Sequence, residues 1–338
     1  MITHSEAVKL LKGNLIEIGK KADEIRRKKH GINSYYVLNR QINYSNVCIS
    51  RCKFCAFARS PGEKGEYLLS NQEIINIIAQ RETDEVHIVG GLHPDLLFCH
   101  YTDMIKAIRS NFPDIWIKAF TAAEIDHFST ISGLQVEEVL SGLKTAGLNS
   151  LTGGGAEIFS DRIRQRLFPK KADADRWLFI HKSAHKIGLR SSATMLFGHI
   201  ETDDEIVHHL FELRKLQAET NGFHAFVALP FHPGSSFLDL PPVSAVRILK
   251  VIALSRIILS NFPHIKAYWV MLTPKLAEIA QFFGADDLDG TIGKELITHS
   301  AGTESPSSMS EEKLRKLITG AGFAPVRRTG NYLKAALQ

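Results

Sequence analysis

Short apolar runs and amphipathic stretches alternate along the chain. Apolar runs of strand length, bounded by glycine, proline or other turn residues, occur at 35–42, 85–91, 115–120, 149–155, 190–198, 223–231 and 265–272, with a weaker one at 284–291. Stretches with helical spacing of apolar residues occur within 3–30 and at about 71–82, 101–111, 136–146, 174–187, 203–219, 243–261 and 275–283. This alternation predicts repeated strand–helix units.

Repeated strand–helix units favour a closed parallel barrel over an open sheet. Parallel neighbours need a crossover helix between them, and short connections after the strands suit closure. We therefore predict an α/β fold of the TIM-barrel type in a single domain. Its parts are N-terminal helices as an extension over 1–34, the barrel over 35–300, and a C-terminal helix and tail over 301–338.

The composition narrows the class of protein and the partners. With 338 residues, 44% of them hydrophobic, the chain can bury a large core. The net charge of +5 is small for this length, and the basic run at 26–29 ends a helical stretch, so we expect no nucleic-acid partner. The apolar run at 251–259 is interrupted by Arg256 and the start has no signal-like segment, so we expect no membrane contact and a cytoplasmic location. The sequence does not indicate the oligomeric state.

Glycines collect where the predicted strands end. Examples are Gly90 and Gly91, the run 153–155, and Gly198. A tight turn explains any one of them, but the C-terminal strand ends are also the working face of such a barrel, and glycine lets a ligand approach the backbone closely. Together they predict a ligand site there.

Three of the four cysteines fall in "NVCISRCKFCAF", directly after the first predicted strand, as Cys48, Cys52 and Cys55. A structural zinc site takes four protein ligands, usually as two pairs, and the remaining Cys99 is distant in sequence. Cysteine-bound iron–sulfur clusters also take four thiolates. Three close cysteines therefore predict an iron–sulfur cluster with one iron open to a non-protein ligand.

The spacing C-x3-C-x2-C, with Phe54 before the last cysteine, resembles the radical S-adenosylmethionine (SAM) superfamily. The resemblance implies a [4Fe-4S] cluster on the three cysteines, with SAM bound to the open iron through its methionyl amine and carboxylate. It also implies reductive cleavage of SAM to methionine and a 5′-deoxyadenosyl radical. An electron donor such as flavodoxin or ferredoxin would then be a partner.

The same resemblance assigns residues to SAM. "VGG" corresponds to the turn that contacts the methionyl amine, although Leu92 and His93 stand where an acid is usual. An apolar side chain in "TMLFGHIE" would pack on the adenine, a carboxylate in "GGGAEI" would accept from the ribose or else cap the next helix, and the aromatic residue of the cysteine motif would reach the adenine edge. The residues implied to contact SAM are Phe54, Gly90, Gly91, Glu157 and Leu196.

Over nearly its whole length the chain is similar to the aminodeoxyfutalosine synthase family. The similarity rests on "GGLHP", "SLTGGGAEIF", "ATMLFGHIET", "ALPFHP", "KAYWVM" and "FGADDLDGT", in this order. It implies that the deoxyadenosyl radical adds to 3-[(1-carboxyvinyl)oxy]benzoate, with loss of CO2 or bicarbonate, to give 6-amino-6-deoxyfutalosine for menaquinone biosynthesis. The alternatives are the cyclic dehypoxanthine futalosine synthases, the enzymes of the deazaflavin chromophore, and an iron–sulfur electron carrier with Cys99 as fourth ligand.

A small substrate with two carboxylates needs cations, hydrogen-bond donors and walls that exclude water. At the predicted strand ends we propose His93 and Glu124 as catalytic residues, and Arg59, His199 and His232 for substrate binding. For each histidine, an ordinary surface or core role is the alternative. Other side chains considered at the site are His127, Phe231 and Trp269, and one of Asp286, Asp287 and Asp289 as a helix cap or ligand contact.

Overall fold

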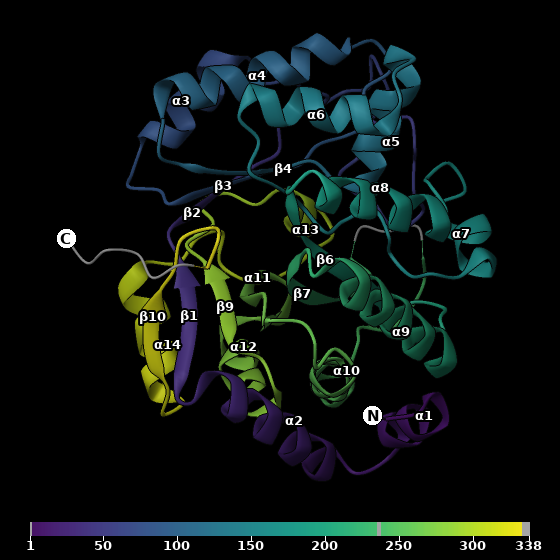
Figure 1. Ribbon diagram of the computed structural model, residues 1–338, viewed down its shortest axis with the longest axis vertical. Coiled ribbons are helices and arrows are strands. Elements are labelled where there is room, and N and C mark those ends of the chain that lie inside the picture. The colour runs from purple at the N-terminus through teal and green to yellow at the C-terminus, as the bar shows by residue number, and fades with distance from the viewer. Residues whose placement is uncertain (1, 235–237, 333–338) are drawn as a thin grey trace.

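The computed structural model describes residues 2–234 and 238–332 (Figure 1). Its strands form one ten-stranded sheet in the order β10-β1-β9-β8-β7-β6-β5-β4-β3-β2, and every pairing is parallel. The strands are β1 (Asn33–Val37), β2 (Asn39–Ile42), β3 (Glu85–Ile88), β4 (Trp116–Ala119), β5 (Ser150–Leu151), β6 (Arg190–Phe197), β7 (Phe223–Pro230), β8 (His264–Lys266), β9 (Asp287–Gly290) and β10 (Ala324–Arg327).

The sheet closes on itself along β1 and β2, which are separated only by Leu38. β1 pairs with β9 and β10, whereas β2 pairs with β3 at the other end of the strand order. Two backbone hydrogen bonds cross this seam. The backbone N–H of Gln41 donates to the Ile292 carbonyl at 2.8 Å, and that of Thr291 donates to the Val37 carbonyl at 3.2 Å. The predicted TIM-type barrel is therefore confirmed. In Figure 1, β10, β1 and β9 lie side by side.

Helices surround the sheet in Figure 1, and α2 packs against α10 and η1 while α1 packs against α9. The predicted N-terminal helices are α1 and α2, and the division of the chain into extension, barrel and tail stays a prediction. No helix in the described ranges is long and apolar enough to cross a membrane. The helices are α1 (His4–Lys12), α2 (Leu15–His30), α3 (Asn71–Ala79), α4 (Phe98–Asn111), α5 (Ala122–Ser132), α6 (Val136–Ala146), α7 (Asp161–Leu167), α8 (Ala174–Lys186), α9 (Asp203–Thr220), α10 (Ala245–Ile258), α11 (Trp269–Leu272), α12 (Pro274–Ala280), η1 (Gln281–Phe283), α13 (Ile297–Ser300) and α14 (Glu311–Gly320).

In strand β3, alternation places apolar residues outside the barrel and polar residues inside it. In β3, Val86 and Ile88 are fully buried in the hydrophobic core between sheet and helices. Because successive side chains point to opposite faces, Glu85 and His87 lie on the inner face. The barrel interior is therefore partly polar, whereas branched apolar layers usually fill such barrels.

The predicted strand at 265–272 is wrong in its second half. β8 ends at Lys266, and residues 269–272 form the short helix α11. Trp269 is fully buried and its indole nitrogen donates to the Gly290 carbonyl at 2.9 Å. A short apolar run that is buried on all sides does not reveal by periodicity whether it is strand or helix.

Candidate active site

The C-terminal ends of the strands surround a cavity of about 320 Å³. Its wall comes from strands β2, β3, β6, β7 and β9, from the segments after β2, β3, β4, β5, β7 and β8, and from α13 with its flanks. Residues singled out from the sequence make up much of this wall. Those that line it are Cys48, Cys52, Phe54, Cys55, Gly90, Gly91, Glu157, Leu196, Phe231, His232 and Asp289.

Backbone hydrogen bonds hold the cysteine loop in place. The Cys48 amide donates to the Arg59 carbonyl and the Cys55 amide to the Cys52 carbonyl, both at 3.0 Å. The guanidinium of Arg59 donates to the carbonyls of Ala56 and Ala58, at 3.0 Å each. Arg59 does not line the cavity, so its role in substrate binding stays a prediction. Its contacts stabilise the conformation of the cysteine loop.

The donor set fits a cluster better than a single metal ion. The three thiols are free, yet they are not among the groups whose ligand atoms lie within 4.8 Å of one another, as one small ion would require. Sulfurs that bind different irons of a cluster are spread more widely. Cys99 is exposed on α4 and does not line the cavity.

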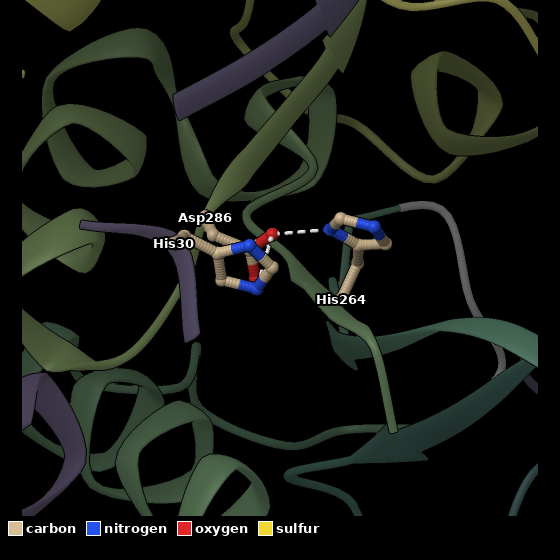
Figure 2. A group of neighbouring side chains, drawn as sticks. All are labelled: His30, His264 and Asp286. Atoms are coloured by element: carbon tan, nitrogen blue, oxygen red, sulfur yellow. Dashed lines mark hydrogen bonds and ion pairs between the residues drawn. The ribbon is translucent and has the colours of Figure 1, made fainter. Parts of the chain in front are cut away.

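In the described part of the chain, the group that does meet this distance is His30, His264 and Asp286 (Figure 2). The Asp286 carboxylate is already engaged. It pairs with Arg256, accepts from His264 Nδ1 at 2.5 Å, and accepts from the Ile265 amide at 2.9 Å. The buried guanidinium opposes a cation here, so we interpret this group as an ion-paired structural cluster.

The glycine turn after β3 packs tightly against the cysteine loop. A Cβ on Gly91 would lie 2.1 Å from the Val47 carbonyl oxygen, and one on Gly90 would lie 2.5 Å from the Tyr44 ring. The Gly91 amide donates to the Ser45 carbonyl at 2.8 Å. Only glycine permits this approach, which fixes the turn beside the cysteines.

Glu124 supports this turn from behind. Its Oε1 accepts from the Tyr44 hydroxyl at 2.9 Å and from the Gly90 amide at 3.1 Å, and its Oε2 accepts from the Thr121 amide at 2.7 Å. Burial raises the pKa of Glu124 to about 7, although these hydrogen bonds act in the opposite direction. Glu124 does not line the cavity, so its catalytic role stays a prediction, and the contacts point to a positioning role.

Lys171 is a cavity residue that sequence reasoning missed. Its Nζ lies 2.5 Å from Glu157 Oε1 and 5.5 Å from the centre of the Phe54 ring. Burial opposes its charge, but Cys52 and Glu157 together raise the pKa of Lys171 above its ordinary value. Burial raises the pKa of the Cys52 thiol while Lys171 lowers it, so this lysine favours a thiolate. Lys171 lies in an irregular segment beside another lysine, so no pattern marks it.

Glu157 takes an unusual backbone conformation. Its φ is +49°, which is rare for a residue other than glycine. The Leu196 amide donates to the Glu157 carbonyl at 2.8 Å, and Lys171 holds the side chain. Strain of this kind persists where surrounding contacts fix it, often at functional sites.

The predicted histidines have different surroundings. His232 lines the cavity, with Nε2 2.9 Å from the Met271 carbonyl oxygen, and burial lowers the pKa of its imidazole. His199 is held by Glu201, 3.1 Å from Nδ1, and does not line the cavity. His93 is also off the wall, and its carbonyl accepts from His127 Nε2 at 2.8 Å. The roles proposed for all three stay predictions.

Several polar wall residues lie within strands or directly after them. The sequence reading treated these segments as core and singled out mainly their glycines and aromatics. Thr121 was expected at a strand end and does line the cavity. The polar residues of the wall that were not expected, besides Lys171, are Gln41, His87, Thr152, Thr194, Tyr268, Glu295 and Thr298.

Comparison with known proteins places the chain in a family. Residues 42–213 match the radical SAM superfamily, and residues 220–337 match the CofH/MqnC C-terminal region. The chain is 41% identical to the aminodeoxyfutalosine synthase of Thermus thermophilus, over 92% of this chain and 86% of that protein. It is 38% identical to the aminodeoxyfutalosine synthase of Streptomyces coelicolor, over 98% and 90%. It is 37% identical to the 5-amino-6-(D-ribitylamino)uracil–L-tyrosine 4-hydroxyphenyl transferase of Methanopyrus kandleri, over 98% and 93%.

Solved structures give the same fold. The [FeFe]-hydrogenase maturase HydG superposes with a TM-score of 0.75 at 18% identity, over 96% of this chain and 73% of that one. Methylornithine synthase superposes with a TM-score of 0.75 at 15% identity, over 97% and 95%. By the family match over residues 42–213 and the identity to these relatives, the chain belongs to the radical SAM superfamily, whose members are enzymes that use a [4Fe-4S] cluster and S-adenosylmethionine.

Proposed function

We propose that this radical SAM enzyme is an aminodeoxyfutalosine synthase. It would join the deoxyadenosyl group of SAM to 3-[(1-carboxyvinyl)oxy]benzoate and release methionine and CO2 or bicarbonate, giving 6-amino-6-deoxyfutalosine for menaquinone biosynthesis. The observation that carries the proposal is the identity of 41% and 38% to two aminodeoxyfutalosine synthases over nearly the whole chain. An electron donor such as flavodoxin or ferredoxin would be its protein partner.

Cys48, Cys52 and Cys55 would hold the cluster, because their free thiols meet in one wall of the cavity. Once bound, the cluster and SAM supply a 5′-deoxyadenosyl radical and methionine. Lys171 keeps positive charge beside the thiolates and balances the negative charge that three of them bring into a buried site.

The surrounding residues would position SAM. The turn of Gly90 and Gly91 is fixed against the cysteine loop, and Glu124 holds the Gly90 amide from behind. Glu157 and Leu196 also line the cavity, and the Leu196 backbone amide donates to the Glu157 carbonyl. This bond would hold the ribose acceptor and the adenine contact at a fixed distance from each other. Phe54 lies under the Lys171 ammonium and completes this side.

The remaining wall would exclude water from the reacting atoms. Val227, Leu229 and Phe231 come from β7 and its end, and Met271 comes from α11. His232 bonds to the Met271 carbonyl and so joins these two elements. An apolar wall of this kind suits a reactive intermediate that water or stray hydrogen donors would quench.

The tyrosine 4-hydroxyphenyl transferase activity is the second candidate. The observation that favours it is the identity of 37% to the enzyme of Methanopyrus kandleri over 98% of this chain. The two activities need different substrates and leave the adenosyl group in different products, so product analysis separates them.

The test is anaerobic reconstitution with iron, sulfide, dithionite and SAM, followed by mass spectrometry of three reactions. One contains 3-[(1-carboxyvinyl)oxy]benzoate, one contains tyrosine with 5-amino-6-(D-ribitylamino)uracil, and one contains dehypoxanthine futalosine. We expect an adenosyl adduct and one methionine per product in the first reaction alone. Product with tyrosine would establish the transferase, and free 5′-deoxyadenosine with cyclised product in the third would establish the cyclase. No turnover in any reaction, with a cluster bound, would favour an electron carrier.

A further inference from the structure

A row of polar side chains crosses the inner face of the barrel below the glycine turn. Gln41 of β2 lies in register with His87 of β3, and His87 lies in register with Lys118 of β4. His87 precedes Gly90 by three residues, so it lies about 10 Å deeper along the strand. Gln41 and His87 line the cavity and form part of its floor.

Two of these side chains lack partners within the protein. Neither the side-chain amide of Gln41 nor the imidazole of His87 makes a hydrogen bond or ion pair within residues 2–234 and 238–332, although Gln41 is only 7% exposed. The Tyr268 hydroxyl, which also lines the cavity, has no such bond in the same ranges. Gln41 is buried, and His87 and Tyr268 are half-buried. Because all three face one cavity without a protein partner in the described ranges, they offer hydrogen-bonding groups to a ligand there.

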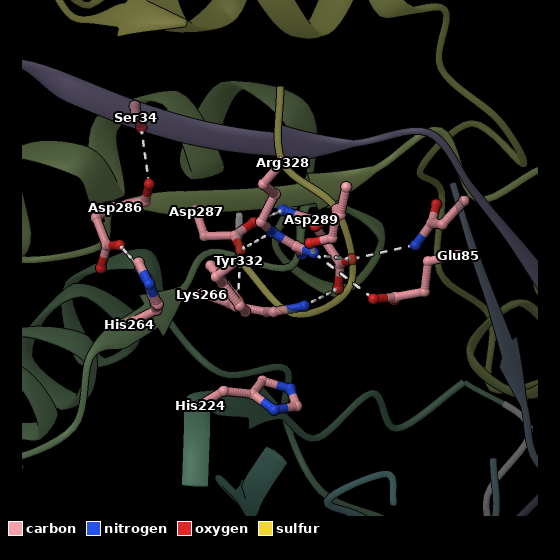
Figure 3. Close-up of polar contacts among 12 residues, drawn as sticks. Ser34, Glu85, His224, His264, Lys266, Asp286, Asp287, Asp289, Arg328 and Tyr332 are labelled. Carbon is pink, nitrogen blue, oxygen red and sulfur yellow. Dashed lines mark hydrogen bonds and ion pairs between the residues drawn. The ribbon is translucent and has the colours of Figure 1, made fainter. Parts of the chain in front are cut away.

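The charged neighbours of this floor are already paired. Lys118 pairs with Glu85. Lys266 lies 3.4 Å from Asp289 (Figure 3). Asp289 also accepts from the Asn39 side chain at 3.2 Å. An ammonium group of a ligand would therefore compete with Lys266 for Asp289, whereas a ligand that accepts hydrogen bonds meets free donors.

The free groups can all donate. Burial lowers the pKa of His87 well below its usual value, and Lys118 acts in the same direction, so the imidazole is neutral and offers one N–H. Gln41 offers an amide NH2 and Tyr268 an O–H. Two or three converging donors with lysine charge behind them suit a planar carboxylate.

We propose that Gln41 and His87, assisted by Tyr268, bind the benzoate carboxylate of the substrate at the cavity floor. The inference rests on the proposed function, because that substrate carries a carboxylate on its ring. The cysteines and the glycine turn lie at the other end of the cavity, so the enol-ether end would face the SAM site. Gln41, His87 and Tyr268 would then decide which aromatic compounds are accepted.

The test compares ligands with and without the ring carboxylate. Dissociation constants are measured by calorimetry on the cluster-loaded enzyme for 3-[(1-carboxyvinyl)oxy]benzoate and for the methyl ester of its benzoate group. We expect the acid to bind about tenfold to a hundredfold more tightly than the ester, as for a hydrogen bond to a charged group. Gln41→Glu should abolish this preference by repulsion and leave the ester almost unchanged. Gln80→Glu makes the same substitution on an exposed residue and should keep the preference.

Gln41→Met covers the case in which a buried glutamate prevents folding, and it should reduce the preference about tenfold. Equal binding of acid and ester by the unmodified enzyme, or an unchanged preference in Gln41→Glu or Gln41→Met, would overturn the inference. Benzoate and methyl benzoate are measured in parallel. If benzoate binds more tightly than methyl benzoate, this difference depends on Gln41 and no adenosyl product forms, the carboxylate site is supported and the proposed function is rejected. Adenosyl product with a preference independent of Gln41 would reject the site alone.

Discussion

Two layers of the barrel interior differ in whether their polar side chains are paired with one another. Near the N-terminal ends of the strands, Arg328 donates to Asp287 at 2.7 Å and lies 3.6 Å from Glu85, and the Tyr332 hydroxyl donates to Asp287 at 2.6 Å (Figure 3). At the cavity floor, the side chains of Gln41 and His87 have no hydrogen-bond or ion-pair partner among the residues that the structure describes. The paired layer can contribute stability, whereas the unpaired groups cost stability and are useful only when a ligand arrives.

The largest expected effect concerns the cysteines. Replacing Cys48, Cys52 or Cys55 with alanine should abolish both cluster binding and product formation, because two thiolates do not hold the cluster. Iron content, visible absorbance and product mass measure this. Cys99→Ala is the matched control and should keep all three, since Cys99 is exposed and off the cavity. Full product formation by any of the three variants would contradict the assignment.

Arg328→Met removes the arginine from the layer of paired side chains near the N-terminal ends of the strands. Removing this guanidinium leaves the carboxylate of Asp287 buried without its cation, whereas Glu85 keeps Lys118. The loss should lower the free energy of unfolding by about 3–5 kcal/mol. Urea unfolding monitored by circular dichroism measures the change. Arg327→Met removes the neighbouring arginine, whose partners Glu82 and Asp84 are nearer solvent, and should cost about 1 kcal/mol or less. Equal losses of stability in Arg328→Met and Arg327→Met would show that the buried ion pairs contribute no more than those near the surface.

Glu124 should make stability depend on pH. Because burial raises its folded pKa to about 7, its favourable contribution is complete below its unfolded pKa of 4.5 and is lost as pH rises through 7. The loss should reach about 3 kcal/mol. Unfolding free energies of the parent and Glu124→Gln, measured from pH 4.5 to 8, should therefore diverge, with the parent losing more. Parallel curves would mean that Glu124 is ionised throughout.

Lys171→Met should weaken SAM binding without a comparable loss of stability. The variant leaves Glu157 unpaired on a wall that is open to the cavity, and we expect about tenfold to a hundredfold weaker binding by calorimetry. Lys170→Met, at the neighbouring exposed lysine, should bind SAM as the parent does. Unchanged affinity in Lys171→Met would remove this lysine from the site.

The smallest effect should come from Trp269→Phe. Its indole bonds to the Gly290 carbonyl and does not line the cavity, so the change should cost about 1 kcal/mol of stability for the lost hydrogen bond. The KM for the aromatic substrate should stay the same, and a large rise in KM would place Trp269 in the substrate pocket.

The barrel could be predicted from the sequence because most of its strands lie side by side in the order in which they occur along the chain. Each strand from β2 to β9 pairs with its neighbour in sequence, so local periodicity and turns are enough. β10 could not be predicted in this way, since it pairs with β1 from the far end of the chain and contains Pro325. Helix α5 was missed although Thr121 and Glu124 form a capping box at its start.

The site was predictable only where its chemistry is local. The three cysteines and the glycine turn carry their spacing in short motifs, and all of them line the cavity. Lys171, Gln41 and His87 belong to no local motif. They are recognised as site residues only in the folded barrel, where separate segments meet at the cavity. For Glu124, the sequence predicts a catalytic carboxylate near a strand end, and this stays a prediction. The sequence does not reveal that its hydrogen bonds go to the backbone and to Tyr44.

The position of Arg328 in the chain affects how the protein is made. Glu85, Asp287 and Asp289 enter the barrel interior with β3 and β9. Lys118 and Lys266 pair with Glu85 and Asp289, but the arginine that pairs with Asp287 is translated after every one of the strands. While that segment is still inside the ribosomal tunnel, the nascent barrel holds excess negative charge in its core. Final consolidation must therefore wait for release of this segment, and a truncated translation product that stops before Arg328 should be recognised by proteases as unfinished.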